Sequence, residues 1–216
     1  MMDGTFSCTQ CGVLTCRKNI GDYPQGCLTE QAAANGLLIE AKEKYDNDPL
    51  VLKVAQSSAK VESEFYCAAT RVEEIIQFCR KIDAKKIGIA TCAGLIKESK
   101  VFAKILQANG LVPCGVICKV GSQDKSEIGI AEEYKIRPGC HEPMCNPILQ
   151  ALTLNREKTD LNVIVGLCVG HDSLFIKYSE ALVTSLITKD RVLGHNPAAA
   201  LYTADGYYRK LMTEIP

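Results

Sequence analysis

The stretch "KKIGIATCAGLIKESKVFAKILQANGLVPCGVICKVG", residues 85–121, decides the expected fold. It begins with a short run rich in β-branched residues and continues as an amphipathic helical pattern that ends at Gly110. A second apolar run, at 111–121, ends the segment. Two parallel strands need a long crossover between them, usually a helix, so this segment predicts a parallel strand–helix–strand unit.

The same alternation continues to residue 190. The runs "LNVIVGLCVG" at 161–170 and "ALVTSLITKD" at 181–190 are the third and fourth expected strands, and helical patterns occupy 146–157 and 172–180. Nearly continuous apolar strands are typical of a parallel sheet that is covered on both faces. We therefore predict an α/β fold: a doubly wound, Rossmann-like, mostly parallel four-stranded sheet with helices on both faces.

Three segments are expected along the chain: a cysteine-rich module at 1–30, a helical segment at 31–84 and the Rossmann-like core at 85–216, together forming one compact unit. Three helices are predicted between the first cysteines and the core. They lie at 29–45, opened by Thr29 as the N-cap, at 49–67, opened by Pro49, and at 70–82.

Composition excludes several classes of function. Lys+Arg and Asp+Glu both number 25 in 216 residues, so no basic balance points to nucleic acid or to an anionic membrane. The N-terminus shows no pattern of a secretory signal, and the most apolar segment is about half the length of a membrane-spanning helix. We expect a soluble cytoplasmic protein, in which the twelve cysteines serve metal binding, catalysis or packing rather than disulfides.

Four cysteines fall within twenty residues near the N-terminus: Cys8, Cys11, Cys16 and Cys27. Their spacing, Cys-x2-Cys-x4-Cys-x10-Cys, has only one of the two Cys-x2-Cys pairs that are usual in zinc ribbons. A compact run of three cysteines with a fourth farther away favours a [4Fe–4S] cluster, and zinc remains the alternative. Arg17 would offset the negative charge of such a cluster.

A second set of cysteines is placed by topology. Cys92, Cys118 and Cys168 follow the first three strands, and Cys145 directly precedes the helix at 146–157. If the strand order is 2-1-3-4, these residues gather at the carboxyl rim of the sheet, where ligands bind in such folds. Four thiolates at this rim predict a second site for zinc or an Fe–S cluster, with Cys140 as an alternative ligand to Cys118.

The two remaining kinds of candidate are histidines and isolated cysteines. His171 and His195 are expected near the rim and are the candidate catalytic residues, because imidazoles there would supply acid–base chemistry near neutral pH. Cys67 and Cys79 lie at helical spacing and are expected to be buried packing residues. The unusually long link at 119–145 is expected to be functional, since it carries Cys140 and Cys145.

Two resemblances add to these patterns. The segment with Cys8, Cys11, Cys16, Arg17 and Gly26–Cys27 is similar to the cubane-binding segment of carbon monoxide dehydrogenases. Most of the chain, above all "GLCVGHDSLFIKYS" and "KDRVLGHNP", resembles an uncharacterised prokaryotic family of metal-binding proteins, domain of unknown function 1847, found mainly in anaerobes. The resemblance implies metal binding through the eight cysteines of the two sets and implies no reaction.

These patterns predict a metal-binding, iron–sulfur redox or electron-transfer protein with a second cysteine-rich site at the sheet rim. A redox partner or a small-molecule ligand is expected at that rim, and a homo-oligomer is compatible with the sequence. The alternatives are a zinc-binding structural or sensor module without catalysis and a cysteine-dependent enzyme. The sequence leaves open whether the protein is an enzyme and, if so, what its substrate is.

Overall fold

The structure, a computed structural model, describes residues 7–18 and 20–215. The chain forms two compact units, Met1–Lys60 and Val61–Pro216, and helix α4 (Pro49–Phe65) runs from the first into the second. The finer three-part division drawn from the sequence stays a prediction. Among the described residues, no helix is both long and apolar enough to cross a membrane.

The second unit is built on one parallel sheet with the strand order β2-β1-β3-β4. Its strands are β1 (Lys86–Thr91), β2 (Val112–Ile117), β3 (Leu161–Val165) and β4 (Leu182–Ile187). The central strands β1 and β3 are almost wholly buried, whereas the edge strands are partly exposed. This confirms the predicted α/β fold and its strand order.

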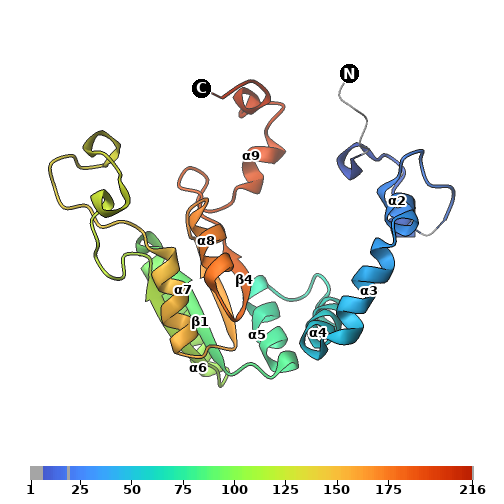
Figure 1. The fold of residues 1–216 in the computed structure, drawn as a ribbon, viewed down its shortest axis with the longest axis horizontal. Helices are drawn as coiled ribbons and strands as arrows, with labels where there is room; N and C mark the ends of the chain where they lie inside the picture. Colours follow the sequence, from blue (N-terminus) through green and yellow to red (C-terminus); the bar gives the residue numbers. More distant parts are fainter. Residues whose placement is uncertain (1–6, 19, 216) are drawn as a thin grey trace. The chain divides into compact units, whose positions relative to one another are not determined.

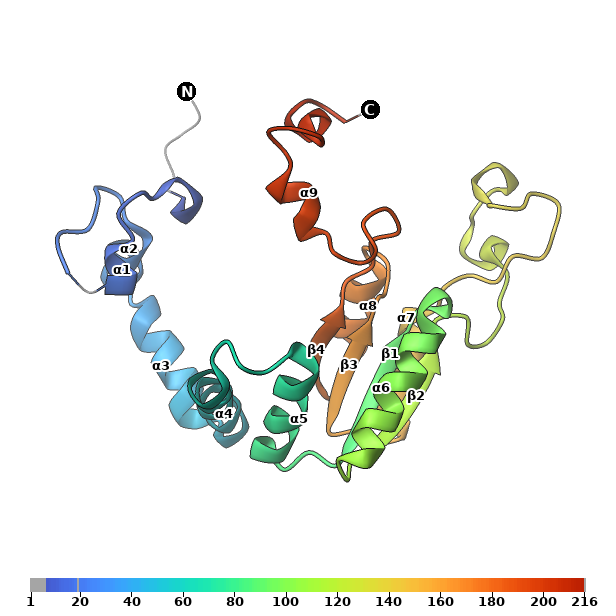
Figure 2. The ribbon, with the colours of Figure 1, turned by 180° about the vertical axis from the view of Figure 1, so that it is seen from behind.

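Helices cover both faces of the sheet, as Figures 1 and 2 show from opposite sides. On one face, α5 and α6 pack over Ile87, Ile89 and Val163, and on the other face α7 and α8 pack over Ala90 and Ile164. Because alternate side chains of β1 and β3 enter different cores, both strands read as continuous apolar runs. The helices are α5 (Arg71–Ile82), α6 (Ile96–Ala108), α7 (Pro147–Arg156) and α8 (His171–Tyr178), and a short α9 (Ala198–Tyr202) follows the sheet.

The first unit contains α1 (Thr15–Lys18), α2 (Leu28–Ala34), α3 (Leu37–Asn47) and most of α4. The single helix predicted over 29–45 is wrong. Gly36 has a φ of +75°, a left-handed conformation that glycine adopts without steric cost, and it separates α2 from α3. The predicted start at Pro49 is confirmed, since α4 begins at this residue. The carboxylate of Asp48, directly before the helix, accepts the backbone N–H of Leu50 at 2.9 Å.

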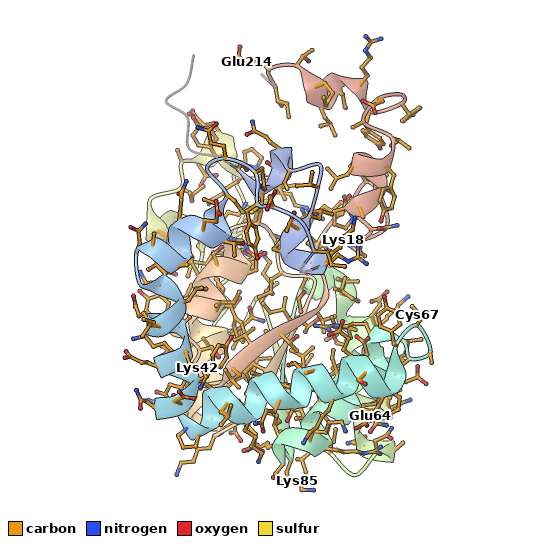
Figure 3. The ribbon with its side chains drawn as sticks, turned by 90° about the vertical axis from the view of Figure 1, so that its right-hand side faces the viewer. Lys18, Lys42, Glu64, Cys67, Lys85 and Glu214 are labelled. Atoms are coloured by element: carbon orange, nitrogen blue, oxygen red, sulfur yellow. The ribbon has the colours of Figure 1, made fainter. Side chains whose placement is uncertain are left out.

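Of the two cysteines that were expected to be buried packing residues, one is buried and the other is exposed. Cys79 on α5 is fully buried in the core, as predicted. Cys67 is exposed, so the prediction for it is wrong. Helix α4 ends at Phe65, the residue after Glu64. Cys67 lies in the turn that follows the helix and has a φ of +54° (Figure 3). The helical spacing therefore does not extend to this residue.

The tightest packing within the sheet predicts an effect on stability. A Cβ added at Gly88 in β1 would lie 2.0 Å from Asn162 Oδ1 and 2.9 Å from Leu154 Cδ1. We expect Gly88→Ala to lower the free energy of unfolding by about 2 kcal/mol, because such overpacking forces neighbours out of their rotamers. The control is Gly115→Ala in β2, where a Cβ meets nothing within 4 Å. Equal unfolding midpoints in urea for the two variants would contradict this packing.

Candidate functional site

The register of the strands brings the ends of β1, β2 and β3 to one level. Thr91, the last residue of β1, pairs with Ile117 of β2 and with Val165 of β3. The backbone N–H of Cys118 donates to the carbonyl of Thr91 at 2.8 Å, and that of Cys92 donates to the carbonyl of Val165 at 3.2 Å. The residues that follow the strands therefore stand side by side at the carboxyl rim.

Gln150 on α7 holds two of these strand ends together. Its side chain is fully buried, and its Nε2 donates to the carbonyls of Val116 at 2.7 Å and Thr91 at 3.2 Å. These carbonyls lie just before Cys118 and Cys92 in sequence. Gln150 thus limits how far the two cysteines can move apart.

Three thiols meet at this rim. The Sγ atoms of Cys118 and Cys145 are 3.8 Å apart, and Cys92 lies close enough to Cys118 for the two thiols to shift each other's pKa. The backbone N–H of Asn146 donates to the carbonyl of Cys118 at 2.7 Å, which holds the chain at Cys145 beside the end of β2. The backbone N–H of Ala93 lies 3.3 Å from the Cys118 sulfur and donates to it. Cys118 is therefore the centre of the cluster.

The contacts among the three thiols shift their pKa values in opposite directions. Hydrogen bonding with Cys118 lowers the pKa of Cys92 to about 5, and hydrogen bonding with Cys118 and then with His171 lowers the pKa of Cys145 to about 4. The same contacts with Cys145 and Cys92 raise the pKa of Cys118. The hydrogen bond to Cys145 also raises the pKa of His171. Cys92 and Cys145 therefore ionise more readily than Cys118, which lies between them.

Two cations approach the rim from the loop that follows β4. Arg191 Nη2 donates to the Sγ of Cys168 at 3.0 Å. Lys189 lies near Cys92 and contributes to the lowering of its pKa. A Cβ added at Gly94 would be 3.3 Å from Lys189 Nζ, so the absence of a side chain there gives the ammonium room. The rim consequently combines soft sulfur groups with two nearby cations.

His195 shapes this cationic loop. Its Nδ1 accepts the backbone N–H of Asp190 at 3.1 Å, and its own backbone N–H donates to the carbonyl of Asp190 at 2.8 Å. The residue has a φ of +67°, an uncommon conformation for a non-glycine residue. His195 therefore closes the turn that carries Arg191, while His171, the other candidate histidine, contacts Cys145 directly.

The long link between β2 and α7 is an ordered loop built on ion pairs. It contains two short 3-10 helices, Lys125–Ile128 and Glu132–Tyr134. Lys135, whose side chain is 4% exposed, pairs with Asp124 at 2.9 Å and with Glu132 at 2.5 Å. Cys140 is exposed on this loop, whereas Cys118 is buried against Cys145. The geometry favours Cys118 over Cys140 as a member of the rim site.

The N-terminal cysteines are less closely associated. Cys8 lies in the 3-10 helix Cys8–Gln10, and the backbone N–H of Cys11 donates to its carbonyl at 3.2 Å. Cys16 is exposed on α1, and Cys27 is buried just before α2. Within residues 7–18 and 20–215, no three Cys, His, Asp or Glu side chains already stand in the arrangement of a metal site. Metal binding by either set of cysteines stays a prediction.

Sequence reasoning placed Cys92, Cys118, Cys145 and Cys168 at one rim of the sheet but missed the groups around them. Lys189, Arg191 and Gln150 carry no metal-ligand or nucleophile signature, so nothing in their residue type drew attention to them. One signal was present for the two cations. They directly follow the fourth strand, which is the same topological position that identified the cysteines.

Comparison with known proteins places the four rim cysteines within a family domain. A family model described as "Protein of unknown function (DUF1847)" matches residues 27–186. An uncharacterised protein of Methanocaldococcus jannaschii is 50% identical over 177 residues, which are 82% of this chain and 86% of that protein. No solved structure matches the chain. The matched range contains Cys92, Cys118, Cys145 and Cys168, whereas Cys8, Cys11 and Cys16 precede it.

The ion pairs of the long loop predict a loss of order in acid. Hydrogen bonds from the Ser126 backbone and the Lys135 ammonium hold the pKa of Asp124 well below its usual range. A lowered carboxyl pKa adds stability that is complete above the unfolded value, about pH 4, and is lost as the pH falls. We expect hydrogen-exchange protection of residues 122–143 to decrease below that pH, and Asp124→Asn to cause the decrease at pH 7.

The matched control for this prediction is Glu133→Gln, a change of an exposed carboxylate on the same loop. It should leave the exchange pattern at pH 7 unchanged. Unaltered protection of residues 122–143 in Asp124→Asn would show that these ion pairs do not order the loop.

Proposed function

The chain belongs to the DUF1847 family of unknown function, and from this premise we propose that it is a metal-binding redox protein. Its functional centre would be the rim site, with Cys92, Cys118, Cys145 and Cys168 as the metal ligands. The contact of the Cys118 and Cys145 sulfurs at 3.8 Å is the observation that carries the proposal.

The spacing of the sulfurs fits one metal ion. Around a tetrahedral zinc ion with Zn–S bonds of about 2.3 Å, neighbouring sulfurs lie about 3.8 Å apart. An iron–sulfur cube binds its thiolates at separate iron atoms, which spaces them more widely. The separation of Cys118 and Cys145 therefore supports a single thiophilic ion at the rim more directly than a cube.

The charge of the surroundings also fits a thiolate–metal site. Metal ligation requires deprotonated cysteines, and the lowered pKa values of Cys92 and Cys145 favour that state. A divalent ion with four thiolates carries two negative charges, which Lys189 and Arg191 would partly balance. Arg191, at 3.0 Å from the Cys168 sulfur, would orient the fourth ligand by its hydrogen bond.

The N-terminal module has a separate part in the proposal. Cys8, Cys11, Cys16 and Cys27 would hold a [4Fe–4S] cluster, which supplies one-electron chemistry when bound, with zinc as the alternative. The support is the cysteine spacing together with Arg17. A reducing cytoplasm would keep all these thiols available, and each of the twelve cysteines is free in the structure.

A ligand or partner would meet the protein at the rim. Arg191 is exposed there, and His171 and Cys168 are partly exposed, so a small molecule could reach a hydrogen-bond donor, an imidazole and a thiol. A redox partner that exchanges electrons with the protein is the other occupant that the proposal allows.

Metal and sulfide analysis of anaerobically purified protein tests the proposal. We expect iron and acid-labile sulfide with a visible absorption band from the N-terminal module, and one further thiophilic ion from the rim. Cys118→Ser and Cys145→Ser should each lose about one ion per chain, because each removes one of four ligands. Cys8→Ser should lose iron and sulfide instead.

The matched controls are Cys140→Ser and Cys67→Ser, which change exposed cysteines outside both sets. Both should retain the metal content of the unaltered chain. Full metal content in Cys118→Ser and Cys145→Ser, with native circular dichroism, would rule out the rim site. Absence of iron and sulfide would rule out the cluster in the N-terminal module.

A further inference from the structure

Cys118 and Cys145 stand at the two ends of the long loop and face each other. Their sulfurs are 3.8 Å apart, and the hydrogen bond from the Asn146 N–H to the Cys118 carbonyl holds the two chain segments side by side. A disulfide requires closely placed backbones and a final S–S distance of about 2 Å. The pair thus needs only a local approach of the two sulfurs.

The two thiols differ in access. Cys145 is partly exposed, whereas Cys118 is 3% exposed and lies behind it, in contact with Cys92. Cys145 also lies two residues before α7, a ten-residue helix with Asn146 as its N-cap, and the N-terminus of a helix favours negative charge. An incoming electrophile would therefore reach Cys145 first and meet Cys118 only afterwards.

We propose that Cys145 and Cys118 form a redox-active dithiol pair that reduces disulfide substrates. The Cys145 thiolate attacks one sulfur of the substrate disulfide, a mixed disulfide forms, and the other substrate sulfur leaves as a thiolate. Cys118 then attacks the Cys145 sulfur, the mixed disulfide breaks, and the proton of Cys118 goes to the second leaving thiolate. The protein loses two electrons and gains a Cys118–Cys145 disulfide, while the two substrate sulfurs leave as one thiolate, which takes a proton from water according to its own pKa, and one thiol.

This activity goes beyond the proposed metal site and does not depend on it, because the exchange needs only the two thiols. It does have a consequence for that site. A Cys118–Cys145 disulfide removes two of the four proposed thiolate ligands, so the oxidised chain would no longer hold the rim ion. Disulfide reduction and metal binding would exclude each other at the same residues.

The test uses the full-length protein, reduced, treated with a chelator and mixed with glutathione disulfide under anaerobic conditions. We expect one intramolecular disulfide, which peptide mapping by mass spectrometry assigns to Cys118 and Cys145. Cys118→Ser should stop after the first step and accumulate glutathione on Cys145. Cys145→Ser should form neither product at this site.

Cys140→Ser is the control and should react as the unaltered chain does. The trapped glutathione on Cys145 is a positive signal at one residue, which a misfolded Cys118→Ser chain with eleven accessible thiols would not give. Glutathione spread evenly over exposed cysteines such as Cys67 and Cys140, or a disulfide between other residues, overturns the proposal. Metal analysis of the reduced chain is separate, so either proposal can fail while the other stands.

Discussion

The pairing of β1 between β2 and β3 is the constraint on which the rim site depends. Thr91 is level with Ile117 and Val165, so the chain leaves all three strands at one height. Two backbone hydrogen bonds continue the ladder to Cys92 and Cys118. A register slip would turn these side chains to the opposite face of the sheet, because the side-chain period of a strand is two residues.

Thiols gathered in this way need polar surroundings, and the loops at the same rim provide them. Lys189 and Arg191 come from the turn closed by His195, and His171 begins α8. The ordered loop between β2 and α7 delivers Cys145 to Cys118. Rigid strands thus set the positions of Cys92 and Cys118, while three loops set their protonation and access. The same arrangement supports both metal ligation and thiol–disulfide exchange.

Much of this architecture could be predicted from the sequence, because strands and crossover helices leave strong periodic signals. The predicted strand order is confirmed, and it places the ends of β1, β2 and β3, which Cys92, Cys118 and Cys168 follow, at the same rim. The break at Gly36 and the exposure of Cys67 were missed, since the apolar spacing predicts helices that continue through both positions. The contact of His171 with Cys145 depends on the path of the loop at 119–145, which no periodicity reports.

The central claim is that Cys92, Cys118 and Cys145, with Cys168, act as one thiolate centre. A crystal structure of anaerobically purified, reduced protein, with anomalous diffraction recorded at metal absorption edges, tests it most directly. The account predicts an anomalous peak at the carboxyl rim within about 2.3 Å of the Cys118 and Cys145 sulfurs. A fully reduced rim without such a peak, beside a metal bound elsewhere in the chain, would contradict it.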